Sequence, residues 1–289
     1  MGVALNNRHQ QEVNQIVTPP SESVKTGPFL RWAGSKRKIL PTLVEYWRSD
    51  YQRYIEPFVG CAALFFRLQP IVAVLGDINT ELIEVYEIVR ENPDTFHEAL
   101  AALPTGEKQY YRIRREVPES LSKFCRAVRF VYLNRHCFNG IYRTNSNGRF
   151  NVPYGGAKPG GIPPVESFRK CSQLLQRATL RACDFGHLLR DTRKGDFVYI
   201  DPPYAVKSRR IFCEYGPREF SNSDIERLAH HLRRMDSRGV HFVVSYADSV
   251  EARRSFAEWK IKRIRVRRHV AGFSSARRMA YELVTTNIK

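Results

Sequence analysis

Short apolar runs alternate with segments of helical periodicity along the chain from about residue 28 onward. Apolar runs bounded by turn residues are typical of buried strands. They predict strands at 53–58, 72–77, 197–200 and 240–246, and a closing antiparallel hairpin built from a half-basic strand around 263–267 and from 281–287. Helices are predicted at about 38–49, from Leu64 onward, at 81–90 after an Asn79 N-cap, and through about Met235 after a Ser221 or Ser223 N-cap. Alternating strands and helices predict an α/β fold.

Two regions depart from this alternation. Residues 1–27 are polar and aperiodic, which predicts a flexible tail. From 92 to about 176 the pattern is helical at first and then rich in Asn, Gly, Pro and Tyr, with the tight-turn signal Asn147-Gly148. We therefore predict one α/β domain formed by 28–91 and 177–289, interrupted by a mostly helical domain over 92–176 that ends in a β-hairpin.

The charge of the chain points to a polyanionic partner. Lys and Arg outnumber Asp and Glu by 47 to 29, which gives a net charge of +18. Nucleic acid is the first candidate and an acidic membrane surface the second. The segment from Lys108 to Arg149 contains ten basic residues and only two acidic ones, Glu116 and Glu119. Aromatic and amide residues lie between the basic ones in the sequence. Because such side chains read and stack on bases, we interpret the inserted domain as a recognition module rather than a structural insertion with a solvated basic face.

Cysteine and histidine usage gives no sign of a metal site. Six cysteines show no CxxC pairing and eight histidines show no metal-ligand spacing, which predicts reduced thiols. No apolar run approaches the roughly 18–20 residues of a membrane span, and no signal peptide is evident. We expect a cytoplasmic protein.

The tetrapeptide Asp201-Pro202-Pro203-Tyr204 directly follows the predicted strand 197–200. Open α/β sheets place their ligand crevices at the carboxyl ends of strands. Two prolines fix the backbone there and remove two N–H donors, so their carbonyls accept beside one carboxylate and one aromatic ring. Such a site suits a flat ring that bears an amino group. Tyr204 would stack on the ring, while Asp201 and a proline carbonyl accept from the amine.

A second pattern is typical of nucleotide binding. The strand 53–58 runs into a turn at Gly60, and the next strand ends in Asp77. A glycine turn suits close approach of the backbone to a ligand, and a strand-end carboxylate suits ribose hydroxyls. The turn has no GxGxxG fingerprint, which disfavours NAD.

Five motifs in this order resemble those of the Dam-like group of D12 class DNA adenine-N6 methyltransferases, in which the cofactor motif precedes the recognition domain and DPPY follows it. They are RWAGSK (31–36), PFVGCAALFF (57–66), GDIN (76–79), YLNRHCFNGIYRTNSNGRFNVPYG (132–155) and DPPY (201–204). The resemblance extends from about Phe29 to Ile288. It implies a Rossmann-like S-adenosylmethionine (SAM)-dependent methyltransferase fold with an inserted, mostly helical DNA-recognition domain ending in a β-hairpin.

The resemblance also implies the residues that contact SAM. They are Trp32, Lys36, Phe58, Gly60, Asp77, Phe185 and Asp201. Lys36 would meet the methionine carboxylate, Asp77 the ribose hydroxyls, and Phe185, after Asp184, the adenine. Ala62 stands where the family usually has a second glycine, which puts the affinity for the cofactor in question.

DNA contacts are implied in the same way. They would come from Arg135, Phe138, Asn139, Ile141, Arg143, Asn145 and Pro153. Phe138 replaces a common tyrosine and would wedge into the stack vacated by the target base, and Arg143 would contact guanine, a geometry worth about 1–3 kcal/mol of discrimination. GATC is a candidate recognition sequence, although 155–158 lacks an aromatic residue of GATC-specific members.

The resulting expectation is a site-specific, adenine-specific DNA methyltransferase. It would act as a monomer on double-stranded DNA, without a metal, and transfer a methyl group from SAM to N6 of a flipped adenine in a short motif. The catalytic residues would be Asp201, Pro202, Pro203 and Tyr204. Two alternatives stay open: methylation of RNA or of protein glutamine through the similar NPPY motif, and a non-catalytic DNA-binding regulator on a decayed scaffold. A solitary, a phage and a restriction-modification role are all compatible with the sequence.

Overall fold

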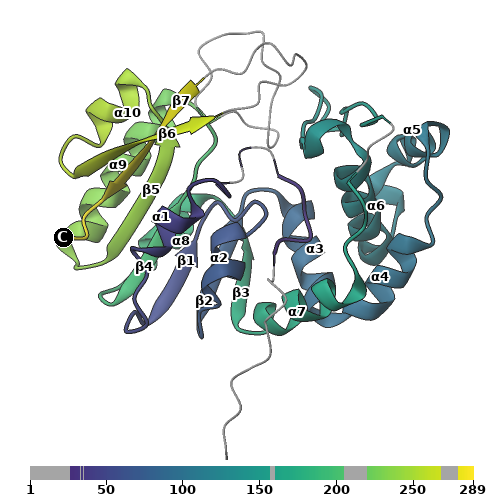
Figure 1. Cartoon of the computed structure of the whole chain (residues 1–289), viewed down its shortest axis with the longest axis horizontal. Coiled ribbons are helices and arrows are strands. Elements are labelled where there is room, and N and C mark those ends of the chain that lie inside the picture. The colour runs from purple at the N-terminus through teal and green to yellow at the C-terminus, as the bar shows by residue number, and fades with distance from the viewer. Residues whose placement is uncertain (1–26, 33, 35, 157–159, 205–219, 268–278) are drawn as a thin grey trace, which may run out of the picture.

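The computed structural model describes residues 27–32, 34, 36–156, 160–204, 220–267 and 279–289. The predicted tail therefore lies, apart from Gly27, outside the described residues, and so do Ala157 and Lys158. The described residues contain a seven-stranded sheet with the order β3-β2-β1-β4-β5-β7-β6 (Figure 1). Its strands are β1 Arg53–Glu56, β2 Ala73–Asp77, β3 Ala178–Ala182, β4 Asp196–Ile200, β5 His241–Ala247, β6 Lys260–Arg267 and β7 Met279–Thr286. β1 to β5 pair in parallel, whereas β7 runs antiparallel to both β5 and β6.

Helices cover both faces of this sheet. The helices of the described residues are α1 Leu40–Val44, α2 Ala63–Leu68, α3 Thr80–Glu91, α4 Pro93–Ala101, α5 Glu107–Arg115, α6 Lys123–His136, α7 Val165–Leu175, α8 Phe185–Arg190, α9 Asn222–Ser237 and α10 Val250–Ser255, with 3-10 turns η1 Pro118–Ser120 and η2 Phe138–Gly140. Successive strand residues point to opposite faces. Thus Val198 and Ile200 of β4 join the core under α8 and α9, and Phe197 and Tyr199 join the core under α1, α2 and α3. Burial on both faces explains why β4 is a continuous apolar run.

The order of the strands fixes where a ligand can bind. From β1 the chain continues to β2 on one side, and from β4 it continues to β5 on the other side. The carboxyl ends of β1 and β4 therefore meet at the point where the strand order reverses. Open α/β sheets form their ligand crevices at this position because the helices that follow the two strands diverge to opposite faces.

Most of the predicted elements are confirmed. The predicted strands correspond to β1, β2, β4, β5 and the antiparallel pair β6–β7. Asn79 caps α3 by accepting a hydrogen bond from the Leu82 amide at 3.2 Å, and Ser221 forms a capping box with Asp224 at the start of α9.

One predicted helix was too long, and one strand was not predicted. The helix expected over 38–49 is limited to α1, because Trp47 and Tyr51 both pack on Phe197 and the chain turns to bring them there. The edge strand β3 was not predicted, since only its first residue, Ala178, is buried and its sequence has no apolar run.

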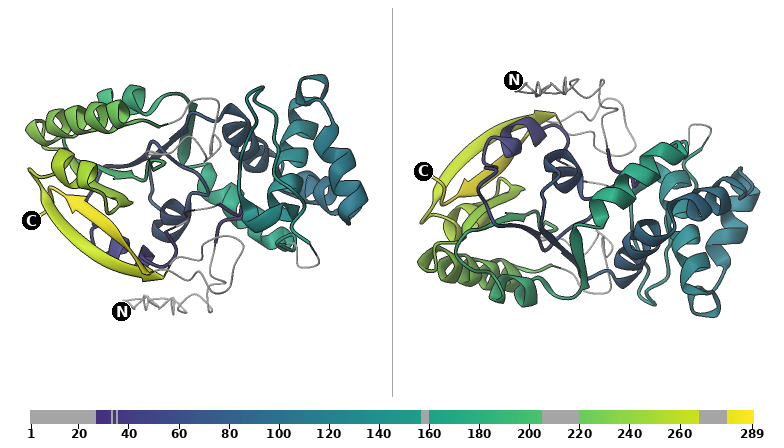
Figure 2. Two further views of the ribbon diagram at one scale, coloured as in Figure 1. Left: turned by 90° about the horizontal axis from the view of Figure 1, so that it is seen from above. Right: turned by 90° about the horizontal axis from the view of Figure 1, so that it is seen from below.

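The predicted inserted domain contributes α4, α5, α6 and α7. Figure 1 shows α4, α5 and α6 at the right, beyond the edge formed by β3, and both views in Figure 2 keep these three helices to one side of the sheet. α6 packs against α3, α4 and α5. The tight turn occurs as expected, with the Gly148 amide donating to the Asn145 carbonyl at 2.9 Å. Within the described residues 141–156, however, only isolated bridges such as Thr144–Phe150 are found, so the β-hairpin is not confirmed and the limits 92 and 176 stay a prediction.

Candidate active site

A pocket opens at the carboxyl edge of the sheet, beside the ends of β1, β2 and β4. It encloses about 1200 Å³, including its open mouth. All residues predicted to contact the cofactor line it, as do all four residues of the tetrapeptide: Trp32, Lys36, Phe58, Gly60, Asp77, Phe185, Asp201, Pro202, Pro203 and Tyr204. The structure therefore brings together side chains that lie up to 172 residues apart in the sequence (Trp32 and Tyr204, 204 − 32).

Lys36 lies at the centre of a buried polar cluster in this pocket. Its Nζ is 3.1 Å from Asp201 Oδ1 and 3.2 Å from Glu282 Oε2, and it donates to Tyr204 Oη at 2.6 Å. The Tyr204 hydroxyl donates in turn to Glu282 Oε1 at 2.9 Å. An ammonium group has three N–H donors, so all three have protein partners in this cluster.

Burial and charge act on this cluster in opposite directions. Lys36 is only 7% exposed, and burial by itself would lower its pKa. The negative charge of Asp201, with Tyr204 and Glu282, outweighs burial and holds the pKa of Lys36 above its usual value. Burial raises the pKa of Asp201, and the neighbouring Lys36 ammonium opposes this shift. The Lys36 ammonium and the Asp201 carboxylate thus stabilise each other's charged form.

One oxygen of Asp201 is anchored by the protein. Ser245 donates to Asp201 Oδ1 at 3.2 Å, and the Tyr199 and Ser245 hydroxyls share a hydrogen bond of 2.9 Å. The Lys36 contact falls on the same oxygen. Among the described residues, no donor contacts Oδ2. The carboxylate is therefore fixed through Oδ1, and Oδ2 keeps its capacity to accept.

Glu56, which lines the pocket, and Glu282, which contacts the lining residues Lys36 and Tyr204, were not predicted from the sequence. Glu282 lies on β7 and Glu56 at the end of β1, and both are buried. Glu56 accepts from Tyr54 Oη at 2.8 Å, and burial raises its pKa well above the usual value. A charged residue inside an otherwise apolar strand was the available signal in both cases, because such a residue is rarely buried without a partner.

The turn after β1 is tied to the end of β2. The Gly60 amide donates to Asp77 Oδ2 at 3.2 Å, and the Asn79 amide donates to Asp77 Oδ1 at 3.0 Å. Gly60 has a positive φ of 45°, and a Cβ at this position would lie 2.9 Å from Trp32 Nε1. Only glycine combines this conformation with this close packing. Burial raises the pKa of Asp77 to about 6, although the backbone amides oppose the shift.

Aromatic rings form the other end of the pocket. Phe58 packs on Phe185 with 5.1 Å between ring centroids, and Phe220 packs edge-on against Phe58 at 5.9 Å. The guanidinium of Arg227 lies over the Phe185 ring at 4.1 Å from its centroid. Arg227 was not predicted, since the sequence of α9 is simply that of an amphipathic helix, and Phe220, which precedes this helix, was not predicted either.

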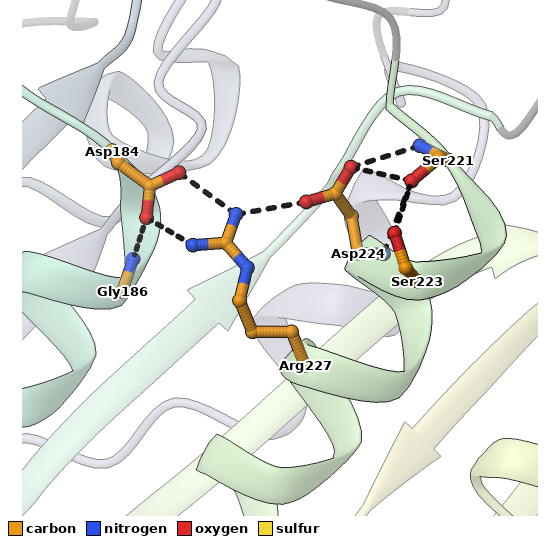
Figure 3. A network of polar contacts seen from close by, with 6 residues as sticks. All are labelled: Asp184, Gly186, Ser221, Ser223, Asp224 and Arg227. Carbon is orange, nitrogen blue, oxygen red and sulfur yellow. Dashed lines mark hydrogen bonds and ion pairs between the residues drawn. The ribbon is translucent and has the colours of Figure 1, made fainter.

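Arg227 also organises the carboxylates at this end (Figure 3). It makes a bidentate contact to Asp184 at 2.6 and 2.8 Å and a further contact to Asp224 at 2.9 Å. Asp224 belongs to the capping box with Ser221, so the network joins α8 to the first turn of α9. Burial would raise the pKa of Asp184, but Arg227 and the Gly186 amide lower it below the usual value.

The predicted DNA-contact residues are not gathered at one point. Asn139, Asn145 and Pro153 are exposed, whereas Phe138 and Ile141 are half-buried against the core. The Phe138 amide donates to the Pro153 carbonyl at 2.9 Å, which joins the two ends of this segment.

Two of the predicted DNA contacts have clear partners within the protein. Asn145 Oδ1 accepts from the Asn147 and Arg149 amides at 3.0 and 2.9 Å and so shapes the tight turn. Arg135 donates to the carbonyls of Phe29 and Gly161, which favours a structural role for its guanidinium.

Arg143 is a third predicted DNA contact with a partner within the protein. Its Nε donates to Asn151 Oδ1 at 2.8 Å, and the residue is half-buried.

The predicted cofactor and DNA segments touch each other. Trp32, which covers Gly60, stacks on Tyr142 with 5.9 Å between centroids and an interplanar angle of 14°. The neighbouring Arg31 exchanges two backbone hydrogen bonds with the Asn134 side chain of α6, at 2.9 and 2.6 Å. The turn that faces the pocket and the segment with the predicted base contacts are therefore in direct contact.

This geometry agrees with comparisons of the sequence. The profile of the family described as D12 class N6 adenine-specific DNA methyltransferase matches residues 32–270. The chain belongs to this family. It is accordingly an adenine-specific DNA methyltransferase by family, and the resemblance inferred from the five motifs is confirmed.

Several characterised proteins are similar over nearly their whole length. The Type II methyltransferase M1.LlaDCHI of Lactococcus lactis subsp. cremoris is 35% identical over 269 residues, covering 90% of this chain and 95% of that protein. The DNA adenine methylase of Haemophilus influenzae is 31% identical over 280 residues, covering 93% and 98%. The DNA adenine methylase of Escherichia coli K12 is 30% identical over 265 residues, covering 90% and 95%.

Membrane-spanning helices and metal-binding groups are both absent from the part of the chain that the structure describes. No helix there is long and apolar enough to cross a membrane. No group of three or more His, Cys, Asp or Glu side chains there is arranged to hold a metal ion.

Proposed function

We propose that the chain uses SAM to methylate N6 of an adenine flipped out of a short duplex DNA motif, acting as a monomer. The observation that carries the proposal is the placement of Asp201. This carboxylate is fixed through Oδ1 and available to accept through Oδ2, beside the Tyr204 ring, in the same pocket as the residues suited to a nucleoside. A site of this kind suits an amine on a flat ring more than a peptide amide or a purely structural role.

The pocket fits SAM in three respects. Gly60 forms the tight turn that lines the pocket after β1, and Asp77 supplies a carboxylate for ribose hydroxyls. Phe58 and Phe185 offer aromatic faces for an adenine ring. When bound, SAM supplies an electrophilic methyl group whose bonding electron pair stays on sulfur.

The residues of the tetrapeptide prepare the target amine. The exocyclic amine of adenine is a poor nucleophile because its lone pair is delocalised into the ring. Hydrogen bonds from the amine to Asp201 Oδ2 and the Pro202 carbonyl localise that lone pair as the N–C bond forms. Tyr204 stacks on the ring and holds the amine in line, so positioning contributes much of the rate. The methylated nitrogen then loses one proton to the Asp201 carboxylate, which passes it to water.

DNA is read by the segment after α6. Arg143 is the candidate for a guanine contact, and Phe138 is the candidate for filling the stack that the flipped adenine leaves. The exposed residues Asn139 and Pro153 flank them. GATC is the first recognition sequence to test, since the segment 132–155 resembles that of the Dam-like enzymes and the predicted contacts include a guanine-reading arginine.

The experiment is expression in a host that lacks DNA methylation, followed by single-molecule sequencing to map N6-methyladenine, with Asp201→Ala as control. Methylation at one short motif that disappears in the variant is the expected result. Soluble protein that binds SAM but leaves every adenine unmethylated would contradict the proposal. RNA from the same cells would then be examined, and DNA binding without any methylation would favour a non-catalytic regulator.

A further inference from the structure

Arg227 joins helix α9 to the aromatic end of the pocket. Its guanidinium makes a bidentate contact to Asp184, with Nη1 2.6 Å from Oδ1 and Nη2 2.8 Å from Oδ2. Nη2 also donates to Asp224 Oδ1 at 2.9 Å, and Cζ lies 4.1 Å from the centroid of the Phe185 ring. Figure 3 shows the guanidinium between the two carboxylates. One side chain therefore holds both a carboxylate and an aromatic ring that line the pocket.

The carboxylate of Asp184 keeps one acceptor position. Its Oδ1 accepts from two donors, the Gly186 amide at 2.9 Å and Arg227 Nη1 at 2.6 Å. Among the residues that the structure describes, Oδ2 accepts from a single donor, Arg227 Nη2. A carboxylate oxygen has two lone pairs, so Oδ2 can accept one more hydrogen bond. Asp184 lines the pocket and its side chain is 25% exposed. It can therefore accept from a ligand that lies against Phe185.

The charge of this carboxylate determines which ligand atom it accepts from. Burial would raise the pKa of Asp184, but the Arg227 guanidinium and the Gly186 amide lower it below the usual value. An ionised carboxylate has no proton to donate, so it favours an N–H group and disfavours a carbonyl oxygen. Adenine carries an amino group at C6, and hypoxanthine carries an oxygen at the same position. The aromatic end of the pocket is therefore suited to a 6-amino purine.

We propose that Arg227 is a positioning residue that fixes the Asp184 carboxylate beside Phe185, and that through Asp184 it makes the pocket selective for a cofactor with a 6-amino purine. This inference rests on the proposed function, because it takes SAM as the cofactor and Phe185 as part of its adenine site. A bidentate pair sets the plane of the carboxylate, which would otherwise rotate about its side-chain bonds. Asp224, in the capping box of α9, holds the guanidinium from the other side.

The probe is the preference for S-adenosylhomocysteine (SAH) over S-inosylhomocysteine (SIH), measured by titration calorimetry. The two ligands differ only in the base, so contacts to the shared homocysteine and ribose cancel in the ratio of their dissociation constants. The wild type is expected to bind SAH roughly a hundredfold more tightly, the value of a hydrogen bond to a charged group. Arg227→Met keeps an apolar contact with Phe185 and loses the guanidinium. It is expected to lower the preference roughly tenfold.

A double variant shows whether Arg227 acts through Asp184. Asp184→Ser keeps a side chain that can cap α8 and loses the carboxylate, so the preference for SAH is expected to fall to about threefold or less. Adding Arg227→Met to Asp184→Ser is expected to change the preference no further, because the group that Arg227 positions is already gone. A further loss of preference in the double variant would mean that Arg227 recognises the base itself, and would overturn the positioning role.

The matched control is Arg233→Met, the same substitution on the same helix. Arg233 is exposed and pairs with Glu258 at 2.7 Å, so the preference is expected to stay unchanged. If Arg227 only joined α8 to α9, Arg227→Met would weaken SAH and SIH by the same factor, and an unchanged ratio would overturn the inference. Thermal melting identifies a loss of fold. Arg227→Lys, which keeps the charge without the bidentate geometry, is expected to have an intermediate preference and serves if the Met variant does not fold.

Methyl transfer to DNA separates this inference from the proposed function. A wild-type protein that prefers SAH to SIH but never methylates DNA would overturn the proposed reaction alone. A wild-type enzyme that methylates DNA but binds SAH and SIH equally would overturn the role of Asp184 and Arg227 alone. An Arg227→Met variant that keeps the full preference would do the same.

Discussion

A carboxylate lies at each end of strand β4, Asp196 as its first residue and Asp201 directly after its last, and the two differ in how their charge is balanced. At the amino end, Asp196 is completely buried and makes a bidentate contact with Arg53, at 2.6 and 2.8 Å. Its Oδ2 also accepts from the Arg193 amide at 2.8 Å. At the carboxyl end, Asp201 shares one lysine with Glu282, and the pocket lies against its other oxygen.

The difference separates stability from chemistry. A one-to-one bidentate pair leaves no charge to spare and satisfies both oxygens, which suits a structural role. At the carboxyl end, Asp201 is held through Oδ1 and lines the pocket, which suits a role in a reaction. The same residue type at the two ends of one strand therefore has two roles, and its partners distinguish them.

The largest expected effect on stability is at the amino end. Asp196→Asn leaves the guanidinium of Arg53 without its counter-charge and is expected to lower the free energy of unfolding by about 3 kcal/mol. Urea denaturation measures this change. The methyl-transfer rate at a temperature where the variant is folded should stay within about twofold of wild type, because distant sites act independently. A large loss of rate in folded protein would remove the distinction between the two ends.

At the carboxyl end of β4, two substitutions distinguish the contribution of the Tyr204 ring from that of its hydroxyl. Tyr204→Ala removes stacking on the target base and is expected to lower kcat/KM for DNA roughly tenfold to a hundredfold. Tyr204→Phe is the matched control, because it keeps the ring and removes the hydroxyl, which bonds Lys36 and Glu282. Steady-state kinetics compare the two variants. Equal losses would mean that the hydroxyl, and not stacking, is what matters.

Asp77, at the carboxyl end of β2, predicts how the affinity for SAM depends on pH. Burial raises the pKa of Asp77 to about 6, so its carboxylate becomes protonated as the pH falls from 7 through 6. A protonated carboxyl group accepts hydrogen bonds from ribose hydroxyls poorly. At pH 5 only about one-tenth of the Asp77 side chains are ionised. The affinity for SAM is therefore expected to fall about tenfold between pH 7 and pH 5. Titration calorimetry at pH 7 and pH 5 measures it. Asp77→Asn should bind weakly at both values, and a wild-type affinity that does not change would contradict the assignment.

The smallest expected effect concerns Ala62. This residue adopts a left-handed conformation (φ 54°), is fully buried, and is absent from the described lining of the pocket although Cys61 and Ala63 are present. Ala62→Gly should therefore relieve backbone strain and raise the free energy of unfolding by up to about 1 kcal/mol. The affinity for SAM should change less than about twofold, since the methyl group does not face the pocket.

Gln69 is the matched control at the other end of α2, with the same positive φ of 54°. Gln69→Gly should raise the free energy of unfolding by a similar amount. A marked rise in SAM affinity for Ala62→Gly alone would show that the methyl group does restrict the cofactor.

The sequence predicted the site better than its surroundings. The tetrapeptide, Gly60 and Asp77 could be placed because each follows a clear apolar strand, and parallel strands bring their carboxyl ends together. Glu282 could not be placed, because its partner Lys36 lies 246 residues away and only the pairing of β7 with β5 brings them together. Arg227 was missed for a similar reason, since its contact with Asp184 depends on how α9 packs against α8.

The predicted hairpin shows a different limit. The Asn147-Gly148 signal correctly placed a tight turn, because Gly148 tolerates the positive φ that the turn requires. The residues beside the turn form isolated bridges instead of strands, since the side chain of Arg143 bonds Asn151 and the Phe138 amide bonds Pro153. The sequence therefore predicted the tight turn correctly. It did not predict the contacts that leave isolated β-bridges in place of a β-hairpin.

The most direct test compares the two ends of β4 in one experiment. Single-turnover methyl transfer from SAM to duplex DNA is measured for the wild type, Asp201→Asn and Asp196→Asn at a temperature where all three are folded. The account predicts that Asp201→Asn loses activity by roughly a hundredfold to a thousandfold, while Asp196→Asn retains it. An Asp201→Asn variant that methylates adenine at the wild-type rate, or two variants that lose activity equally, would contradict the assignment of the carboxyl end of β4 as the catalytic site.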